Sequence, residues 1–403
     1  MKKNLTISSL LIALLFMLTS AYTASAVTIK PNINLDHPVI MADRTETIYV
    51  QVDFDVPADY IDVRRHRPDL NIGLVIDRSG SMADRGKMNY AKDAANFVID
   101  QLNPSDRIAI VEYDDRVTLL ARSQNVTSKW RLKSKINELY PRGATNLTGG
   151  MMRGIDELIE YYSSRDINRI LLLSDGLANR GITSMRDIKR LVKQARRDGI
   201  TISTIGLGLD YNEDLMQMIA EYGGGTYYYI ESPRQMRDIF EAEMGQIFAT
   251  VAKDVKARLK RSRHVRDFEI YGYVNDDGRD VASIGNLYAG EKISLTCKLE
   301  VSPSEAGEIN LGDFEFDYYD VKTNKTITFK KPLSVKVTKN VQAKEQAENK
   351  DVRAEALVVE ADAFHEKQVR LVEQGRADEA KKNITKYQAG MAAAAPSLNN
   401  ALL

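Results

Sequence analysis

Apolar strand-like segments alternate with amphipathic helical segments between residues 70 and 250, and this alternation restricts the fold more than any other feature. Three of the strand segments, "NIGLVI", "RILLLS" and "ISTIGLGL", are apolar without a period of two, which is typical of strands covered on both faces. Strands separated by helices usually pair in parallel, so the pattern predicts an α/β fold with a doubly wound, mostly parallel sheet. The expected strands are 71–77, 107–113, 117–122, 168–174, 201–207 and 226–230. The expected helices lie near 87–102, 128–139, 148–162, 184–198, 212–222 and 233–250.

One expected strand departs from the parallel arrangement. The segment 117–122 follows the strand 107–113 after a connection too short for a parallel crossover. We therefore expect 117–122 to form an antiparallel hairpin at the edge of the sheet.

The segments on both sides of this α/β unit have a period of two instead. In "TIYVQVDFDV", residues 47–56, the positions 48, 50, 52, 54 and 56 place Ile, Val, Val, Phe and Val on one face. Residues 251–340 offer further strands separated by the turn signals "NDDG" and "KTNK". The pattern predicts a small antiparallel, sandwich-like β domain. Its first strand lies in the segment 27–69, and the α/β unit 70–250 is inserted after it. An unstructured linker on the amino side is the alternative.

The amino terminus has the layout of a secretory signal peptide. Lys2 and Lys3 precede an apolar run over 10–18, and the small residues of "TASA" end at Ala26. We expect residues 1–26 to be removed and the chain to be exported, either to the periplasm or, as a secreted protein, to the cell surface or beyond; an uncleaved anchor is the alternative. Removal leaves 54 basic and 56 acidic residues, a net charge of minus two that indicates no nucleic-acid partner. No later stretch approaches the roughly 18 apolar residues of a membrane span.

The carboxyl-terminal region, residues 341–403, is rich in Ala, Glu, Lys and Gln. Gly375 separates two helical patterns, which predicts a helical hairpin. A solvated, weakly packed tail fits equally well, because the apolar stripe is broken; its members are Leu357, Val358, Phe364, Val369 and Leu371.

The chain has a single cysteine, Cys297, and therefore no intrachain disulfide. Cys297 alternates in phase with Leu295, Leu299 and Val301, which predicts a buried, inert thiol rather than a reactive one.

Side chains with oxygen ligands follow the ends of two expected strands. Asp77, Ser79 and Ser81 stand in "DRSGSM", and Asp175 ends the strand of "LLLSDG". Thr145, in "GATNLTGG", lies in a loop just before a helix. Ligands of open α/β sheets bind beyond the carboxyl ends of the strands, so these three loops are expected to converge. Carboxylate and hydroxyl oxygens suit a hard divalent cation such as Mg²⁺. Simple helix capping is the alternative, but it explains neither Thr145 nor Asp175.

These motifs, in this order, resemble the metal-ion-dependent adhesion site of von Willebrand factor type A domains, and all five positions match. The resemblance covers 70–250, and the text from "GLGLDYNEDL" onward is similar to exported bacterial members labelled calcium-activated chloride channel homologues. It implies direct metal contacts from Ser79, Ser81 and, in the ligand-ready state, Thr145, with Asp77 and Asp175 acting largely through bound water. A cation held mostly by neutral hydroxyls stays electrophilic, so we expect it to accept an Asp or Glu of a partner protein. Mg²⁺ is the expected ion, and Mn²⁺ or Ca²⁺ also suit such a site.

The sequence does not complete any of the three enzyme motifs that it partly matches. The α/β unit contains no histidine, so a Ser-His-Asp triad has no local base; the four histidines are His37, His66, His264 and His365. "FHEKQV" lacks the second histidine of a zinc protease, and "GSMADRGKM" departs from the phosphate-loop spacing. We expect a non-enzymatic, adhesion-type binding module. The alternative is a scaffold or assembly-factor subunit for an envelope enzyme or ATPase complex; a third class, an ion-channel component, follows only from the family label.

Overall fold

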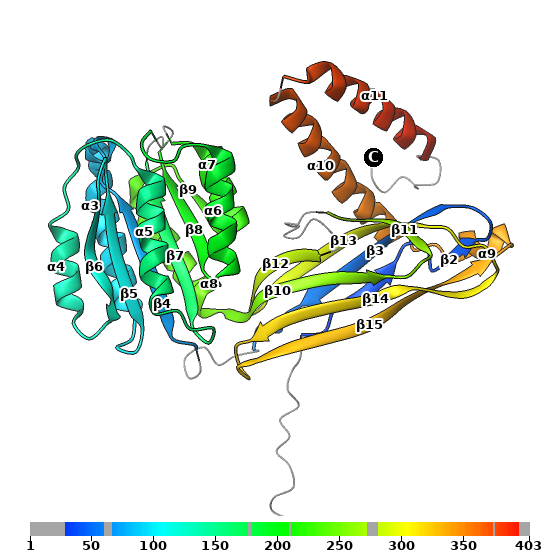
Figure 1. The fold of residues 1–403 in the computed structure, drawn as a ribbon, viewed down its shortest axis with the longest axis horizontal. Coiled ribbons are helices and arrows are strands. Elements are labelled where there is room, and N and C mark those ends of the chain that lie inside the picture. Colours follow the sequence, from blue (N-terminus) through cyan, green and yellow to red (C-terminus); the bar gives the residue numbers. More distant parts are fainter. Residues whose placement is uncertain are drawn as a thin grey trace, which may run out of the picture.

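The computed structural model describes residues 29–59, 67–175, 179–208, 211–271, 281–373 and 375–394. Figure 1 shows an α/β unit beside a β-sandwich, with a pair of long helices projecting from the sandwich. The expected signal peptide, residues 1–26, lies outside the described residues.

The α/β unit is built on a six-stranded sheet in the order β6-β5-β4-β7-β8-β9. All neighbouring strands are parallel except the edge pair β5 and β6, which is antiparallel. The doubly wound, mostly parallel sheet and its antiparallel edge hairpin are therefore confirmed. The strands are β4 (Leu70–Asp77), β5 (Arg107–Tyr113), β6 (Val117–Asn125), β7 (Ile167–Ser174), β8 (Thr201–Leu207) and β9 (Gly224–Ile230).

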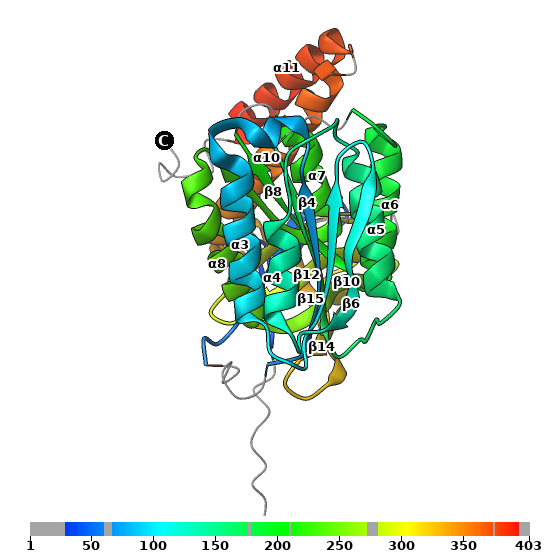
Figure 2. The same ribbon diagram turned by 90° about the vertical axis from the view of Figure 1, so that its left-hand side faces the viewer.

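Helices cover both faces of this sheet. Figure 2 shows α3, α4 and α8 on one side and α5 and α6 on the other. The helical elements are η1 (Gly80–Gly86), α3 (Lys87–Gln101), α4 (Lys129–Asn137), α5 (Leu147–Ile159), α6 (Met185–Arg197), α7 (Glu213–Gly223), η2 (Pro233–Gln235) and α8 (Met236–Phe248). Ile72 and Leu74 of β4 pack into the core under α3 and α8, whereas Val75 packs into the core under α5, α6 and α7. Every residue of β4 is buried, which explains the apolar run without alternation.

The β-sandwich consists of two sheets, β1-β3-β13-β11 and β12-β10-β14-β15-β2. Its strands are β1 (Asn32–Leu35), β2 (Val39–Met41), β3 (Glu46–Asp55), β10 (Thr250–Arg261), β11 (Val265–Tyr271), β12 (Val281–Tyr288), β13 (Lys292–Val301), β14 (Gly307–Asp320) and β15 (Lys325–Thr338). β3 pairs with β13 from the other end of the chain, so the α/β unit is inserted in the β domain. The amino-terminal segment supplies three strands where the sequence indicated one, and β2 pairs in parallel with β15.

The carboxyl-terminal helices are α9 (Val341–Gln346), α10 (Lys350–Glu373) and α11 (Ala377–Ala394). α10 lies against β3, β11 and β13, where Ala356 and Leu357 pack on Tyr49 and Tyr271. The rings of Phe364 on α10 and Tyr387 on α11 stack at 4.1 Å. The predicted helical hairpin is thus present, and the first turns of α10 are docked on the sandwich. Within the described residues, no helix combines the length and apolar character that crossing a membrane requires.

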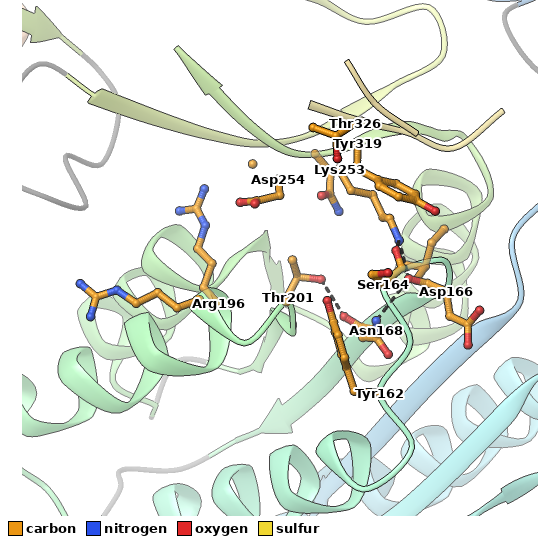
Figure 3. Close-up of a pocket in the computed structure, with 15 residues that line it drawn as sticks. Tyr162, Ser164, Asp166, Asn168, Arg196, Thr201, Lys253, Asp254, Tyr319 and Thr326 are labelled. Atoms are coloured by element: carbon orange, nitrogen blue, oxygen red, sulfur yellow. Dashed lines mark hydrogen bonds between the residues drawn. The ribbon is translucent and has the colours of Figure 1, made fainter. Parts of the chain in front are cut away.

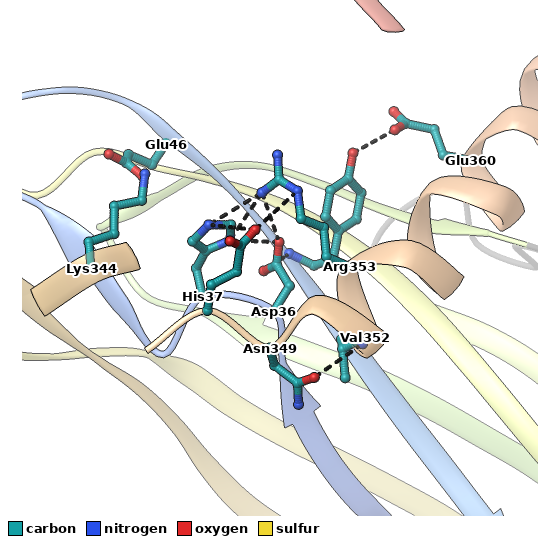
Figure 4. A network of polar contacts seen from close by, with 10 residues as sticks. Asp36, His37, Glu46, Lys344, Asn349, Val352, Arg353 and Glu360 are labelled. Atoms are coloured by element: carbon teal, nitrogen blue, oxygen red, sulfur yellow. Dashed lines mark hydrogen bonds and ion pairs between the residues drawn. The ribbon is translucent and has the colours of Figure 1, made fainter. Parts of the chain in front are cut away.

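A buried polar network fixes the start of α10 to the amino-terminal segment (Figure 4). The Asp36 carboxylate accepts the Tyr49 backbone N–H at 2.7 Å and contacts Nδ1 of His37 at 2.7 Å. The Arg353 guanidinium of α10 lies 3.7 Å from the same carboxylate, and the Asn349 backbone N–H donates to the Asp36 carbonyl at 2.7 Å. The network joins chain segments more than 300 residues apart, which accounts for the position of α10.

Candidate functional site

Asp77 is the last residue of β4, and its carboxylate is fully buried. Its Oδ1 accepts the Ser79 backbone N–H at 2.7 Å, and its Oδ2 accepts the Ser174 hydroxyl at 2.8 Å. Burial, together with the charge of Asp175, raises the pKa of Asp77 to about 6. A second carboxylate is thus close enough to destabilise the ionised form, a situation that a bound cation would relieve.

Asp175 follows the end of β7, and its carboxylate reaches the two serines of the η1 turn. The Ser81 hydroxyl donates to Oδ1 of Asp175 at 2.7 Å, and the Ser79 hydroxyl lies 3.4 Å from the same atom. The two hydroxyl oxygens are 3.1 Å apart. The structure therefore brings together four of the five residues singled out in the sequence, Asp77, Ser79, Ser81 and Asp175.

The loop that carries Thr145 is joined to this group by backbone hydrogen bonds. Its backbone N–H donates to the Asn179 side chain at 3.1 Å, and its carbonyl accepts the Asn179 backbone N–H at 3.2 Å. The carbonyl of Gly143 in the same loop accepts the Gly80 backbone N–H at 3.1 Å. The Thr145 loop thus lies between the loop after Asp175 and the turn that carries Ser79 and Ser81, and the Thr145 side chain is buried.

A cluster of ion pairs holds the Thr145 loop in place. The Arg78 guanidinium pairs with Glu112 and with Asp114, at 3.1 and 2.9 Å. Asp114 also accepts the Arg142 side chain at 2.9 Å, and its carbonyl accepts the Asn146 backbone N–H at 2.8 Å. These contacts fix both ends of the loop, so the site is preorganised by its surroundings.

Sequence reasoning missed Lys87. Its Nζ donates to Oδ2 of Asp175 at 2.7 Å, and the lysine side chain is only 8% exposed. The chain kinks at Arg85 and Gly86, with φ of 51° and 74°, before α3 begins at Lys87. In the sequence this lysine stood out only as part of the failed phosphate-loop pattern, because its carboxylate partner is 88 residues away.

The donor set fits a hard cation. Two fully buried carboxylates and the hydroxyls of two serines meet at the carboxyl ends of β4 and β7. Within the described ranges, no group of three or more His, Cys, Asp and Glu side chains is placed to hold a metal ion. A cation at Asp77 and Asp175 would therefore depend on hydroxyl oxygens as well.

A cavity of about 220 Å³ lies between the α/β unit and the sandwich (Figure 3). Ile167, Asn168 and Thr201 line it, and these residues begin β7 and β8, so it lies at the opposite edge of the sheet from Asp175. Lys253 of β10 donates to the carbonyls of Ser164 and Asp166 in its wall. Burial lowers the pKa of Lys253 to about 8. The cavity therefore lies at the interface between the α/β unit and the sandwich, away from the candidate metal site.

The chain resembles known proteins in sequence. The family model of the von Willebrand factor type A domain matches residues 71–242. The uncharacterised protein YfbK of Escherichia coli (strain K12) is 33% identical over 249 residues, which are 59% of this chain and 43% of that protein. An uncharacterised protein of Synechocystis is 26% identical over 290 residues, 68% of this chain and 67% of that protein. This chain thus spans less than half the length of its Escherichia coli relative.

Solved structures extend the likeness over nearly the whole chain. The ArnB paralog VWA2 from Sulfolobus acidocaldarius aligns with a TM-score of 0.63 and 18% identity, covering 89% of this chain and 88% of that one. At this identity the likeness concerns the fold alone. A distant match to calcium-activated chloride channel regulator 4 of Homo sapiens, 24% identical, covers 42% of this chain and 18% of that protein. The resemblance to that group of proteins therefore stays a prediction.

Proposed function

Because residues 71–242 form a von Willebrand factor type A domain, a class that commonly mediates protein–protein interaction, we propose that this chain binds a partner protein through a divalent cation. The cation would be held by Asp77, Ser79, Ser81, Thr145 and Asp175. Mg²⁺ is the proposed ion, and Mn²⁺ or Ca²⁺ would use the same oxygen ligands.

The contact that carries this proposal is the meeting of Asp175 with the two serines. Oδ1 of Asp175 lies within 3.4 Å of both serine hydroxyls, so a carboxylate from one loop and two neutral oxygens from another face the same point. A hard divalent cation takes about six oxygen ligands. If each of the five side chains supplied one oxygen ligand, directly or through water, one position would remain for a carboxylate oxygen of a partner.

The serines and the aspartates would have different roles in binding the cation. Ser79 and Ser81 would supply neutral oxygens, which leave positive charge on the ion, and the Thr145 loop contacts the serine turn through the Gly80 N–H and the Gly143 carbonyl. Asp77 and Asp175 hold the serine turn by accepting a backbone N–H and a hydroxyl. The bound cation would supply the electrostatic attraction for an Asp or Glu of the partner.

We place this binding outside the cytoplasm and propose no catalysis. The layout of residues 1–26 supports export and removal after Ala26. The α/β unit has no histidine, and in the described structure the serine hydroxyls contact a carboxylate that is already paired with Lys87. This arrangement favours holding a ligand over activating a nucleophile.

A scaffold or assembly factor for an envelope enzyme or ATPase complex is the second candidate. α10 exposes the apolar side chains of Val358, Val369 and Val372, which are available for contact with another protein away from the metal site. A chain with both features could hold two partners at once.

The test is a pull-down from the native envelope fraction with the full chain as bait, in Mg²⁺ and in chelator. The doubly substituted variant Ser79→Ala/Ser81→Ala removes two cation ligands without removing a charge. Asp187→Ala, an exposed carboxylate on α6, is the matched control. We expect a partner that is retained only in Mg²⁺, by the wild type and the Asp187 variant. Capture that survives chelator and the double substitution would rule out a metal bridge, and an enzyme or ATPase subunit among metal-independent partners would favour the scaffold.

A further inference from the structure

Lys87 is enclosed beside the candidate metal site. Its side chain is 8% exposed, and a Cβ built at Gly208, in the loop after β8, would lie 3.5 Å from its Nζ. A buried ammonium is unfavourable unless it is paired, and Lys87 pairs with Oδ2 of Asp175 at 2.7 Å. The chain therefore places a positive charge against one of the two carboxylates that face the site.

The Asp175 carboxylate is divided between two neighbours. Oδ1 faces the serine hydroxyls, and Oδ2 faces Lys87. A cation bound on the serine side would meet Oδ1 and leave the Lys87 contact intact. Lys87 can thus act on the cation through Asp175 without being displaced by it.

The contact is specific to Asp175. The carboxylate of Asp77 instead accepts hydrogen bonds from neutral donors, among them the Ser79 N–H and the Ser174 hydroxyl. Arg78, although next to Asp77 in sequence, directs its guanidinium to Glu112 and Asp114. Among the residues that the structure describes, Lys87 is thus a positively charged side chain paired with a carboxylate of the site.

We propose that Lys87 is a positioning residue that holds Asp175 and reduces the negative charge felt by the bound cation. This inference rests on the proposed metal site. The ammonium repels a dication nearby, so it weakens metal affinity. In return, the bound ion keeps more of its positive charge for a partner carboxylate. Lys87 thus lowers the affinity of the site for the metal and raises the affinity of the bound metal for an acidic ligand.

A purely structural role for Lys87 makes a different prediction. If Lys87 only fixed the orientation of Asp175, every substitution that disturbs the contact would weaken metal binding. If its charge matters, neutral substitutions strengthen metal binding and charged ones do not. The sign of the change in metal affinity on neutral substitution therefore distinguishes the two roles.

The experiment measures Mn²⁺ binding to the full chain by titration calorimetry. Lys87→Met removes the charge and the hydrogen bond, Lys87→Gln keeps an N–H donor without the charge, and Lys87→Arg keeps the charge. Lys92→Met is the control, because Lys92 lies on the same helix and donates to the Asn137 carbonyl instead of a carboxylate. We expect Lys87→Met and Lys87→Gln to bind Mn²⁺ about tenfold more tightly than the wild type, as removal of a nearby like charge requires. Lys87→Arg and Lys92→Met should stay close to the wild type.

Thermal melting in chelator supplies a second readout. Without Lys87 the Asp175 carboxylate loses its positively charged partner beside the Asp77 carboxylate, so Lys87→Gln should melt below the wild type in chelator and gain more from Mn²⁺. If neutral variants bind Mn²⁺ equally or more weakly while the wild type binds it, the inference about Lys87 is wrong and the metal site stands. If Lys87→Met does not fold, the Mn²⁺ affinity of Lys87→Gln alone tests the inference. A wild type that binds no Mn²⁺ overturns both the site and the role of Lys87.

Discussion

The Arg169 guanidinium on β7 and the Glu243 carboxylate on α8 form an ion pair of 2.8 Å in which both side chains are completely buried. Ser203 donates to the same carboxylate oxygen at 2.7 Å, and Tyr228 donates to the other oxygen at 2.9 Å. Arg169 also donates to the hydroxyl of Tyr288 on β12 at 3.1 Å, so the pair links the α/β unit to the sandwich.

Breaking this pair leaves an uncompensated charge in the core. We expect Glu243→Gln to lower the free energy of unfolding by about 3 to 5 kcal/mol, because the guanidinium of Arg169 stays buried. Urea unfolding followed by circular dichroism measures the change, and Glu241→Gln on the exposed side of α8 is the control. A loss below about 1 kcal/mol would show that Arg169 finds another partner or water.

Removing the amino-terminal strands should unfold the sandwich. β3 lies between β1 and β13 and contributes Ile48, Val52 and Phe54 to the core. A fragment of residues 250–340 then exposes both the edge of β13 and the core side chains that packed on β3. We expect it to aggregate in gel filtration, whereas a fragment of residues 69–249 should melt cooperatively as a monomer. A monomeric, cooperative fragment 250–340 would contradict the shared sandwich.

The partly buried amine of Lys253 should make the stability depend on pH. Its pKa is lowered by burial to about 8 from the ordinary 10.5, so below pH 8 the cost of burying the ammonium is fully present. As the pH rises from 8 to 10.5, the folded state releases this proton before the unfolded state does, and the stability rises.

The comparison with Lys253→Met isolates this effect. We expect the unfolding free energy of the wild type, relative to that of the variant, to rise by about 2 to 3 kcal/mol across this interval. Lys256→Met, on the same strand with a more exposed side chain, is the control. A difference that stays constant from pH 7 to 10.5 would mean that Lys253 titrates as a solvated amine.

The thiol of Cys297 should be inert in the folded chain. Cys297 lies on β13 with its side chain in the sandwich core, and burial raises the pKa of the thiol to about 12. Reaction with a thiol reagent requires access and the thiolate, so labelling should be slow in the native protein and fast in urea. Rapid labelling of the native chain would show that this strand opens readily.

The parallel sheet could be predicted because β4, β7 and β8 carry apolar residues on both faces, a pattern that needs no knowledge of partners. β1 and β2 could not be predicted, because they have only four and three residues and are stabilised by pairing with β3 and β15. Pairing between distant segments leaves no local periodicity. The single arginine in "INRILLLS" was a signal for a buried partner, but the sequence did not identify Glu243 as that partner.

The loops of the candidate site followed from a general rule, because Asp77 and Asp175 end strands of one parallel sheet. The role of Lys87 could not be predicted in this way, because a lysine at the start of a helix is common and only the folded chain places it beside Asp175. This contact also changes how the site should be tested. Asp175→Ala would leave Lys87 buried without its carboxylate and cost stability on its own. Substitution of Ser79 and Ser81 avoids that complication.

Mg²⁺ binding to the full chain, measured by titration calorimetry together with the thermal melting point, tests the metal site most directly. Metal that binds only the folded state stabilises it by about 2.7 kcal/mol at a hundredfold excess over Kd. The wild type should therefore bind Mg²⁺ and melt higher than in chelator, and Ser79→Ala/Ser81→Ala should lose most of this gain while remaining folded. If the wild type binds neither Mg²⁺ nor Mn²⁺ at millimolar concentration, or if the double variant is stabilised as much as the wild type, Asp77, Ser79, Ser81, Thr145 and Asp175 are not a cation site.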